Sequence, residues 1–172
     1  MSGDTVTVAG DRELTLRDTA AVRECFGWER RTVTIDCHSG HSIEGVWRGV
    51  PVAPAVEAAG FPAETTHLWA TAHDGHQVCV PIRTALGGLL GFVCEALDDP
   101  REDKGGDTAE TPRLVAPDID SARAVRGLAR VEPAALPPGE GPRAHERPDS
   151  HPAVRVPPRS LPPVQCQVSP RM

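Results

Sequence analysis

Cys37 is the residue of this chain whose type and position most directly suggest chemistry. It ends an alternating apolar run, Thr32-Val33-Thr34-Ile35-Asp36-Cys37, and a short turn follows it, His38-Ser39-Gly40-His41. A cysteine at the end of a strand, facing a glycine-containing turn, presents its sulfur to whatever lies beyond the edge of the sheet. Such a thiolate can ligate a metal, act as a nucleophile or do neither. The neighbouring residues favour a ligand for a soft metal.

The histidines near this cysteine allow two alternatives. Cys37, His38 and His41 form one group, and His73 and His76 form another. Together they suit zinc or copper, because both metals accept thiolate and imidazole ligands, but the two groups would have to meet in space. The other alternative is nucleophilic catalysis by Cys37 with His38 or His41 as its base, although no third group that would orient the base is evident.

The elements that position these residues are expected to be short. Apolar alternation and turn signals predict strands over 5–9, 11–16, 31–37, 42–47, 66–71, 76–80, 91–97, 113–115 and 128–131. Helices are expected over 17–23, 52–59 and 81–90. Strands and helices do not alternate regularly in this series. The predicted class is therefore α+β, with mixed β-sheets and a few short helices. Val33, Ile35, Ile43 and Trp47 are expected to face the core.

Composition divides the chain at about residue 135. Of the 172 residues 18 are proline, and 11 of these prolines lie in 133–172, a segment with no Phe, Trp or Tyr. Such a segment buries too little apolar area to offset the entropy of ordering its backbone. Residues 1–135 are therefore expected to form one domain and 136–172 a Pro-rich disordered tail.

Charge and apolar content exclude several classes of partner. The net charge is −6, which argues against the clustered basic face that nucleic acids require. No apolar run approaches membrane-spanning length, and the N-terminus, Met1-Ser2-Gly3-Asp4, lacks a signal pattern. The five cysteines contain no CxxC pair, so no disulfide framework is expected. We expect a cytoplasmic protein that binds neither nucleic acid nor membranes.

Several short motifs follow one another in order between residues 5 and 132. They are Val6-Thr7-Val8-Ala9-Gly10, Glu13-Leu14-Thr15-Leu16-Arg17-Asp18, Ile35-Asp36-Cys37, Trp47-Arg48-Gly49-Val50-Pro51-Val52, Asp74-Gly75-His76, Pro112-Arg113-Leu114-Val115-Ala116-Pro117, and the spaced residues Arg123, Arg126 and Leu128. In this order they resemble the sulfite oxidase-like, molybdopterin-binding oxidoreductase domain family. The resemblance implies the fold of that family for residues 1–135.

The resemblance also implies a function. Cys37 falls where the family places the cysteine that ligates molybdenum, and the molybdopterin cofactor would be held by Cys37, His38, Ser39, Gly40, Arg123 and Arg126. The implied activity is oxo transfer with a two-electron change at the Cys-ligated molybdenum, on a small-molecule substrate that the sequence does not identify. Because no haem or flavin motif is present, the electrons are expected to pass to an electron-transfer partner protein.

The chain departs from the family pattern at three places near the implied site. His38-Ser39-Gly40-His41 replaces the Asn-Arg pair that follows the cysteine in sulfite oxidases, His76 replaces the turn tyrosine, and Gly127 stands where a tryptophan is usual. Sulfite is therefore not implied as the substrate. The alternative function is a cofactor-free binding module that retains the fold.

Overall fold

The computed structural model describes residues 4–36, 40–98, 110–139 and 141 of the chain. These residues form short helices and strands in the order β1 (Val6–Ala9), β2 (Glu13–Leu16), α1 (Ala20–Phe26), β3 (Glu29–Asp36), β4 (Ser42–Pro51), α2 (Val52–Ala59), β5 (His67–Ala72), β6 (Gln77–Pro81), α3 (Ile82–Leu86), β7 (Leu89–Asp98), β8 (Arg113–Val115) and β9 (Leu128–Ala134).

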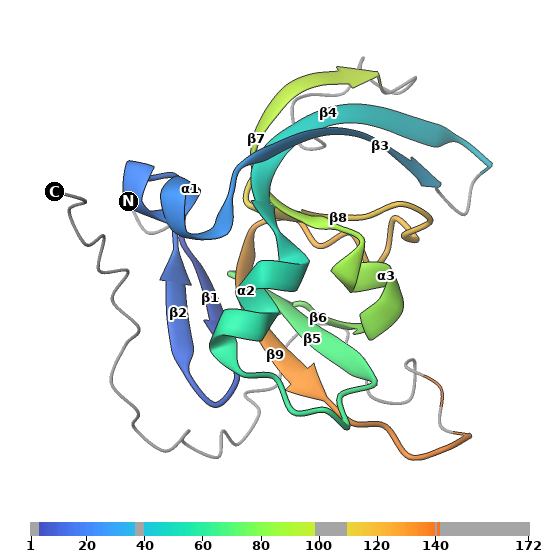
Figure 1. Ribbon diagram of the computed structural model, residues 1–172. Coiled ribbons are helices and arrows are strands. Elements are labelled where there is room, and N and C mark those ends of the chain that lie inside the picture. Colours follow the sequence, from blue (N-terminus) through green and yellow to red (C-terminus); the bar gives the residue numbers. More distant parts are fainter. Residues whose placement is uncertain (1–3, 37–39, 99–109, 140, 142–172) are drawn as a thin grey trace, which may run out of the picture.

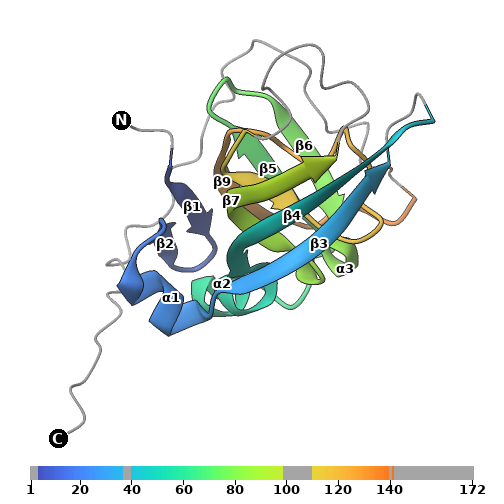
Figure 2. The same ribbon diagram turned by 90° about the horizontal axis from the view of Figure 1, so that it is seen from above.

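The strands build two sheets. One has the order β2-β1-β9-β5-β6, with β1 and β9 parallel and the other neighbours antiparallel. The other has the order β3-β4-β7-β8 and is antiparallel throughout. Figure 1 shows β3, β4 and β7 at the top of the molecule and β5, β6 and β9 below them, and Figure 2 shows the first three side by side from above. Mixed sheets with a few short helices are an α+β arrangement, as the sequence predicts.

Apolar residues from both sheets and from α2 form one buried cluster. Ile35 and Trp47 are fully buried, and Val33 and Ile43 are nearly so, which confirms the predicted inward face of β3 and β4. The two strands pair in register from Glu29–Gly49 to Asp36–Ser42, so their buried residues lie on the same face. This hairpin carries the end of β3, where the sequence analysis placed the candidate cysteine.

Two helices differ from their predicted bounds. The first starts at Ala20 instead of residue 17, because the Thr19 hydroxyl accepts a hydrogen bond from the Val22 amide at 3.3 Å and caps the helix. The third ends at Leu86 instead of residue 90. A Cβ on Gly88 would lie only 2.5 Å from the Val115 carbonyl oxygen, so the chain there passes close to β8 and turns into β7.

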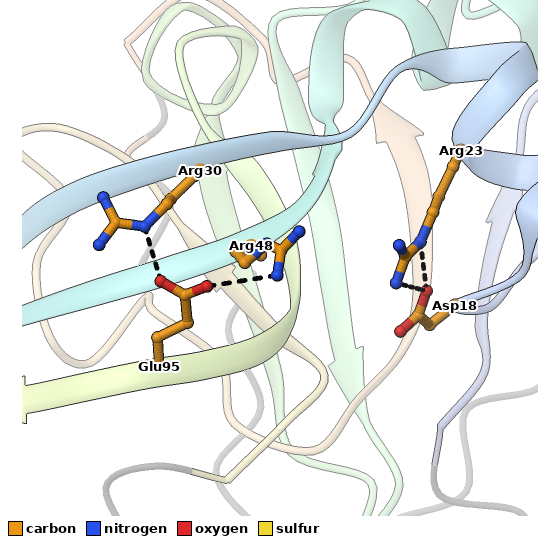
Figure 3. Close-up of polar contacts among 5 residues, drawn as sticks. All are labelled: Asp18, Arg23, Arg30, Arg48 and Glu95. Carbon is orange, nitrogen blue, oxygen red and sulfur yellow. Dashed lines mark hydrogen bonds and ion pairs between the residues drawn. The ribbon is translucent and has the colours of Figure 1, made fainter.

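Charged side chains tie three strands of the second sheet together on an exposed face (Figure 3). Arg30 of β3 donates from Nε to Glu95 Oε2 of β7 at 2.6 Å, and Arg48 Nη1 of β4 lies 3.3 Å from Glu95 Oε1. The hydrogen bond from Arg30 is the main cause that lowers the pKa of Glu95. The β4–β7 ladder shifts register beside this carboxylate, between Val46 and Trp47 and again after Arg48. The two ion pairs of Glu95, with Arg30 and with Arg48, thus span an irregular part of the sheet.

Two further expectations concern the cysteines and the tail. Cys25 of α1 is disulfide-bonded, a bond that the expectation of no disulfide framework did not include, whereas Cys79 and Cys94 form no disulfide. None of the helices in the described part of the chain is long and apolar enough to cross a membrane. Of the predicted tail, residues 136–139 and 141 are described, and the Leu136 amide still donates to the Thr66 hydroxyl at 2.9 Å. The rest of the predicted tail lies outside the described residues.

Candidate functional site

The end of β3 lies against a segment that is distant in the sequence. Asp36 pairs with Ser42 on one side and forms a parallel bridge with Asp120 on the other. Its carbonyl oxygen accepts the Ser121 amide at 3.1 Å, and its carboxylate Oδ1 accepts the Ser42 hydroxyl at 2.7 Å. The last described residue before the candidate cysteine is therefore fixed from both sides.

Three of the predicted site residues, Cys37, His38 and Ser39, lie outside the described residues. Gly40 is described, and its backbone has a φ of 80°, a left-handed conformation that favours glycine. A Cβ at Gly40 would meet no atom within 4 Å, so this glycine meets a conformational requirement of the turn and not a packing requirement.

A cavity with a volume of about 520 Å³ lies beside Ser121, in the segment that contacts the end of β3. Its walls are the β5–β6 turn, Glu110 and the segment before β9, and the residues that line it are Ala72, His73, Asp74, His76, Glu110, Ser121, Ala122, Ala124, Val125, Arg126 and Gly127. Ser121 belongs both to this lining and to the contact with Asp36. The cavity therefore adjoins the end of β3.

A main-chain hydrogen bond holds the β5–β6 turn against the opposite wall, and a bond to a side chain closes the turn itself. The His73 amide donates to the Gly127 carbonyl at 2.9 Å, and the His76 amide donates to Asp74 Oδ1 at 2.9 Å. Gly75 has a φ of 91°, which completes the turn. His73 and Asp74 are exposed at the rim, and His76 is half-buried.

The structure separates the two predicted arginine ligands. Arg126 is exposed and lines the cavity. Arg123 does not line it: its Nε donates to the Cys79 carbonyl of β6 at 3.1 Å, and its Nη1 lies 3.8 Å from Asp120 Oδ2. Burial and, after it, the charge of Arg123 lower the pKa of His67 at the start of β5. The Arg123 guanidinium thus joins its own turn to the first sheet.

Glu110 is a cavity residue that the sequence analysis did not single out. Gly127 has a φ of 60°, and a Cβ there would lie 2.9 Å from Glu110 Oε1, so the missing side chain leaves room for this carboxylate. Ser121 was also missed. Gly127, which stands where the resembled family usually has a tryptophan, could have pointed to Glu110, because the absent side chain leaves room for this carboxylate. No neighbouring residue indicated Ser121, because its role depends on the contact with Asp36.

The zinc or copper interpretation gains no support from the described residues. Among them no three His, Cys, Asp or Glu side chains are grouped closely enough to hold a metal ion. His73 and His76 share the cavity lining, and His41 does not belong to it. Cys37 and His38, the other members of the predicted set, lie outside the described residues.

The described fold belongs to the class of α+β proteins built from two mixed or antiparallel sheets. No protein-family model matches the chain, and no curated protein matches it. Solved structures do match. One is the crystal structure of the sulfane dehydrogenase SoxCD from Paracoccus pantotrophus, with 19% sequence identity and a TM-score of 0.59. The match covers 78% of this chain and 39% of that chain, and at this identity it shows a shared fold alone.

Proposed function

We propose that this protein is a molybdopterin-dependent oxidoreductase in which Cys37 ligates the metal. The observation that carries the proposal is the contact of Asp36 with Ser121, because it joins the strand that leads to Cys37 to the wall of a cavity that Arg126 lines. The fold likeness to a sulfane dehydrogenase, which is by name a redox enzyme, supports an oxidoreductase of the sulfite oxidase-like class.

The described residues fit such a cofactor in part. The cavity volume of about 520 Å³ is in the range of pockets that enclose small organic molecules. An exposed guanidinium, that of Arg126, suits a phosphate group, which it can bind through two parallel hydrogen bonds. The carboxylates of Asp74 and Glu110 in the same lining would repel a phosphate. We therefore expect Arg126 to meet the cofactor's anionic end, together with the predicted ligands His38, Ser39 and Gly40.

The protein residues would bind, orient and shield the reacting centre. When bound, the cofactor supplies oxo transfer and the two-electron change, since no protein side chain performs these alone. Arg123 would act as a positioning residue, because its hydrogen bond to Cys79 holds the turn that carries Arg126. The substrate would be a small molecule that enters through the cavity, and a partner protein would accept the electrons.

Metal analysis tests the proposal. The full chain, produced in a host that makes the cofactor, should contain about one molybdenum per chain, since a single thiolate completes the ligand set. Cys37→Ser should lose the metal, whereas Cys94→Ser, which alters a free cysteine outside the cavity lining, should retain it. Arg126→Gln should lower the molybdenum content measured per folded chain.

A folded wild-type protein that contains no molybdenum would refute the proposal. In that case the alternative is a cofactor-free binding module, in which the same cavity holds a small ligand directly. Zinc or copper at one equivalent, lost in both Cys37→Ser and His76→Gln, would instead favour the histidine interpretation.

A further inference from the structure

The described residues that line the cavity include more acidic than basic side chains. Among the described residues that line it, Asp74 and Glu110 bear carboxylates and Arg126 bears the guanidinium. Both of these acidic residues are exposed. Opposite charges about 4 Å apart attract by about 1 kcal/mol even in water. An attraction of this size is large enough to discriminate between ligands that differ only in charge.

The backbone restrains both carboxylates. Asp74 Oδ1 accepts the His76 amide at 2.9 Å, which holds the side chain within its own turn and leaves the second oxygen available. Glu110 lies over Gly127, with Oε1 only 2.9 Å from the position that a Cβ would occupy. Any side chain at residue 127 would displace this carboxylate from the cavity wall.

A minor part of the lining is apolar. Ala72, Ala124 and Val125 are buried, and they line the same cavity as the two carboxylates. An apolar group of a ligand could contact these residues, and a polar end group could contact the carboxylates and the imidazoles of His73 and His76. The lining therefore suits an amphipathic small molecule.

We propose that this cavity selects neutral or cationic substrates over anionic ones, with Glu110 and Asp74 as the residues that determine this specificity, while Arg126 is the lining residue that would meet the cofactor's phosphate. The proposal deepens the proposed function, because it takes the cavity as the space through which the substrate of the oxidoreductase enters.

Three probes of the same shape test the charge preference: benzamidine as the cation, benzamide as the neutral compound and benzoate as the anion. Binding of each to the purified full chain is measured by calorimetry or by ligand-observed NMR at about pH 8, where imidazoles in general are neutral. We expect benzamidine to bind most tightly and benzoate most weakly. Glu110→Gln and Asp74→Asn should each reduce the ratio of benzamidine to benzoate affinity by roughly fivefold or less, as expected for partly solvated carboxylates.

Glu57→Gln is the matched control, since Glu57 is an exposed carboxylate of α2 that does not line the cavity, and it should leave the ratio unchanged. Benzoate as the tightest ligand, an unchanged ratio in both cavity variants, or no binding of any probe in the millimolar range would overturn the inference. Molybdenum content is measured on the same samples. Absence of the metal with an intact charge preference would refute the proposed function alone, and the reverse result would refute this inference alone.

Discussion

Replacing Gly49 by alanine should destabilise the sheet that carries the candidate site. Gly49 lies in β4 opposite Gly91 of β7. A methyl group at its Cβ position would overlap the carbonyl oxygen of Leu90 and lie 2.8 Å from the Leu90 carbonyl carbon. Both obstacles are backbone atoms of a paired strand, which cannot rotate aside as a side chain would. The β4–β7 ladder would have to open at this point.

The expected loss of stability follows from the kind of obstacle. Overpacking a core typically costs about 1–3 kcal/mol, and backbone overlap places this substitution at the upper end, at about 3 kcal/mol. For a domain of this size each kcal/mol lowers the melting temperature by about 3–5 °C, so Gly49→Ala should melt about 10 °C lower than the wild type. Because β4 pairs with β3 as well, the contact between Asp36 and Ser121 should weaken along with the sheet.

Thermal unfolding followed by circular dichroism measures the effect, with Gly87→Ala as the matched control. Gly87 has an ordinary negative φ of −81°, and a Cβ there would meet only the Thr84 carbonyl oxygen, at 3.6 Å. At such a compatible position alanine is neutral or stabilises by up to about 1 kcal/mol. Equal melting temperatures for Gly49→Ala and Gly87→Ala would show that β4 and β7 do not pair in this register, and the position of the candidate site would lose its basis.

Three further predictions concern charge and the tail. The lowered pKa of Glu95 means that its pairing with Arg30 stabilises the fold above the unfolded value of about 4.5 and that this contribution disappears as the pH falls through the lowered folded value. The stability difference between wild type and Glu95→Gln should therefore shrink in acid, and a difference that grows there would contradict the pairing. Arg123→Gln should raise the pKa of His67, measured by NMR, only part of the way to its ordinary value, because burial is the larger cause; an unchanged pKa would place the guanidinium elsewhere. Under reducing conditions, which remove any contribution of the disulfide at Cys25, deletion of residues 142–172 should change the melting temperature little, and a large decrease would show that this segment packs on the domain.

Local signals in the sequence predicted most of the elements. The helix over 52–59 was found with its correct bounds, because Gly60 takes the left-handed conformation that ends a helix, with a φ of 71°. The alternation in β3 and β4 gave the buried face that Ile35 and Trp47 occupy. The end of the helix depends on contacts within a few residues. The buried face of the strands follows from the two-residue period of their side chains.

The errors lie where distant residues decide the local structure. The helix expected over 81–90 is cut short because Gly88 passes the Val115 carbonyl, a contact with a strand that comes much later in the chain. The parallel pairing of β1 with β9 likewise joins the two ends of the domain, and neither strand alone carries a signal for it. In the same way, the bridge between Asp36 and Asp120 could not be read from either segment, although the candidate site depends on it.

The two arginines show how a correct spacing can give an incomplete site. Residues three apart would lie on one face of a helix, but the segment from Asp120 to Gly127 is not helical, and its side chains diverge. Arg123 contacts β6, whereas Arg126 lines the cavity. An anionic group in the cavity would therefore meet one of these guanidiniums directly. It follows that Arg126→Gln should lower cofactor retention more than Arg123→Gln does, and that any effect of Arg123→Gln should appear together with a lower melting temperature.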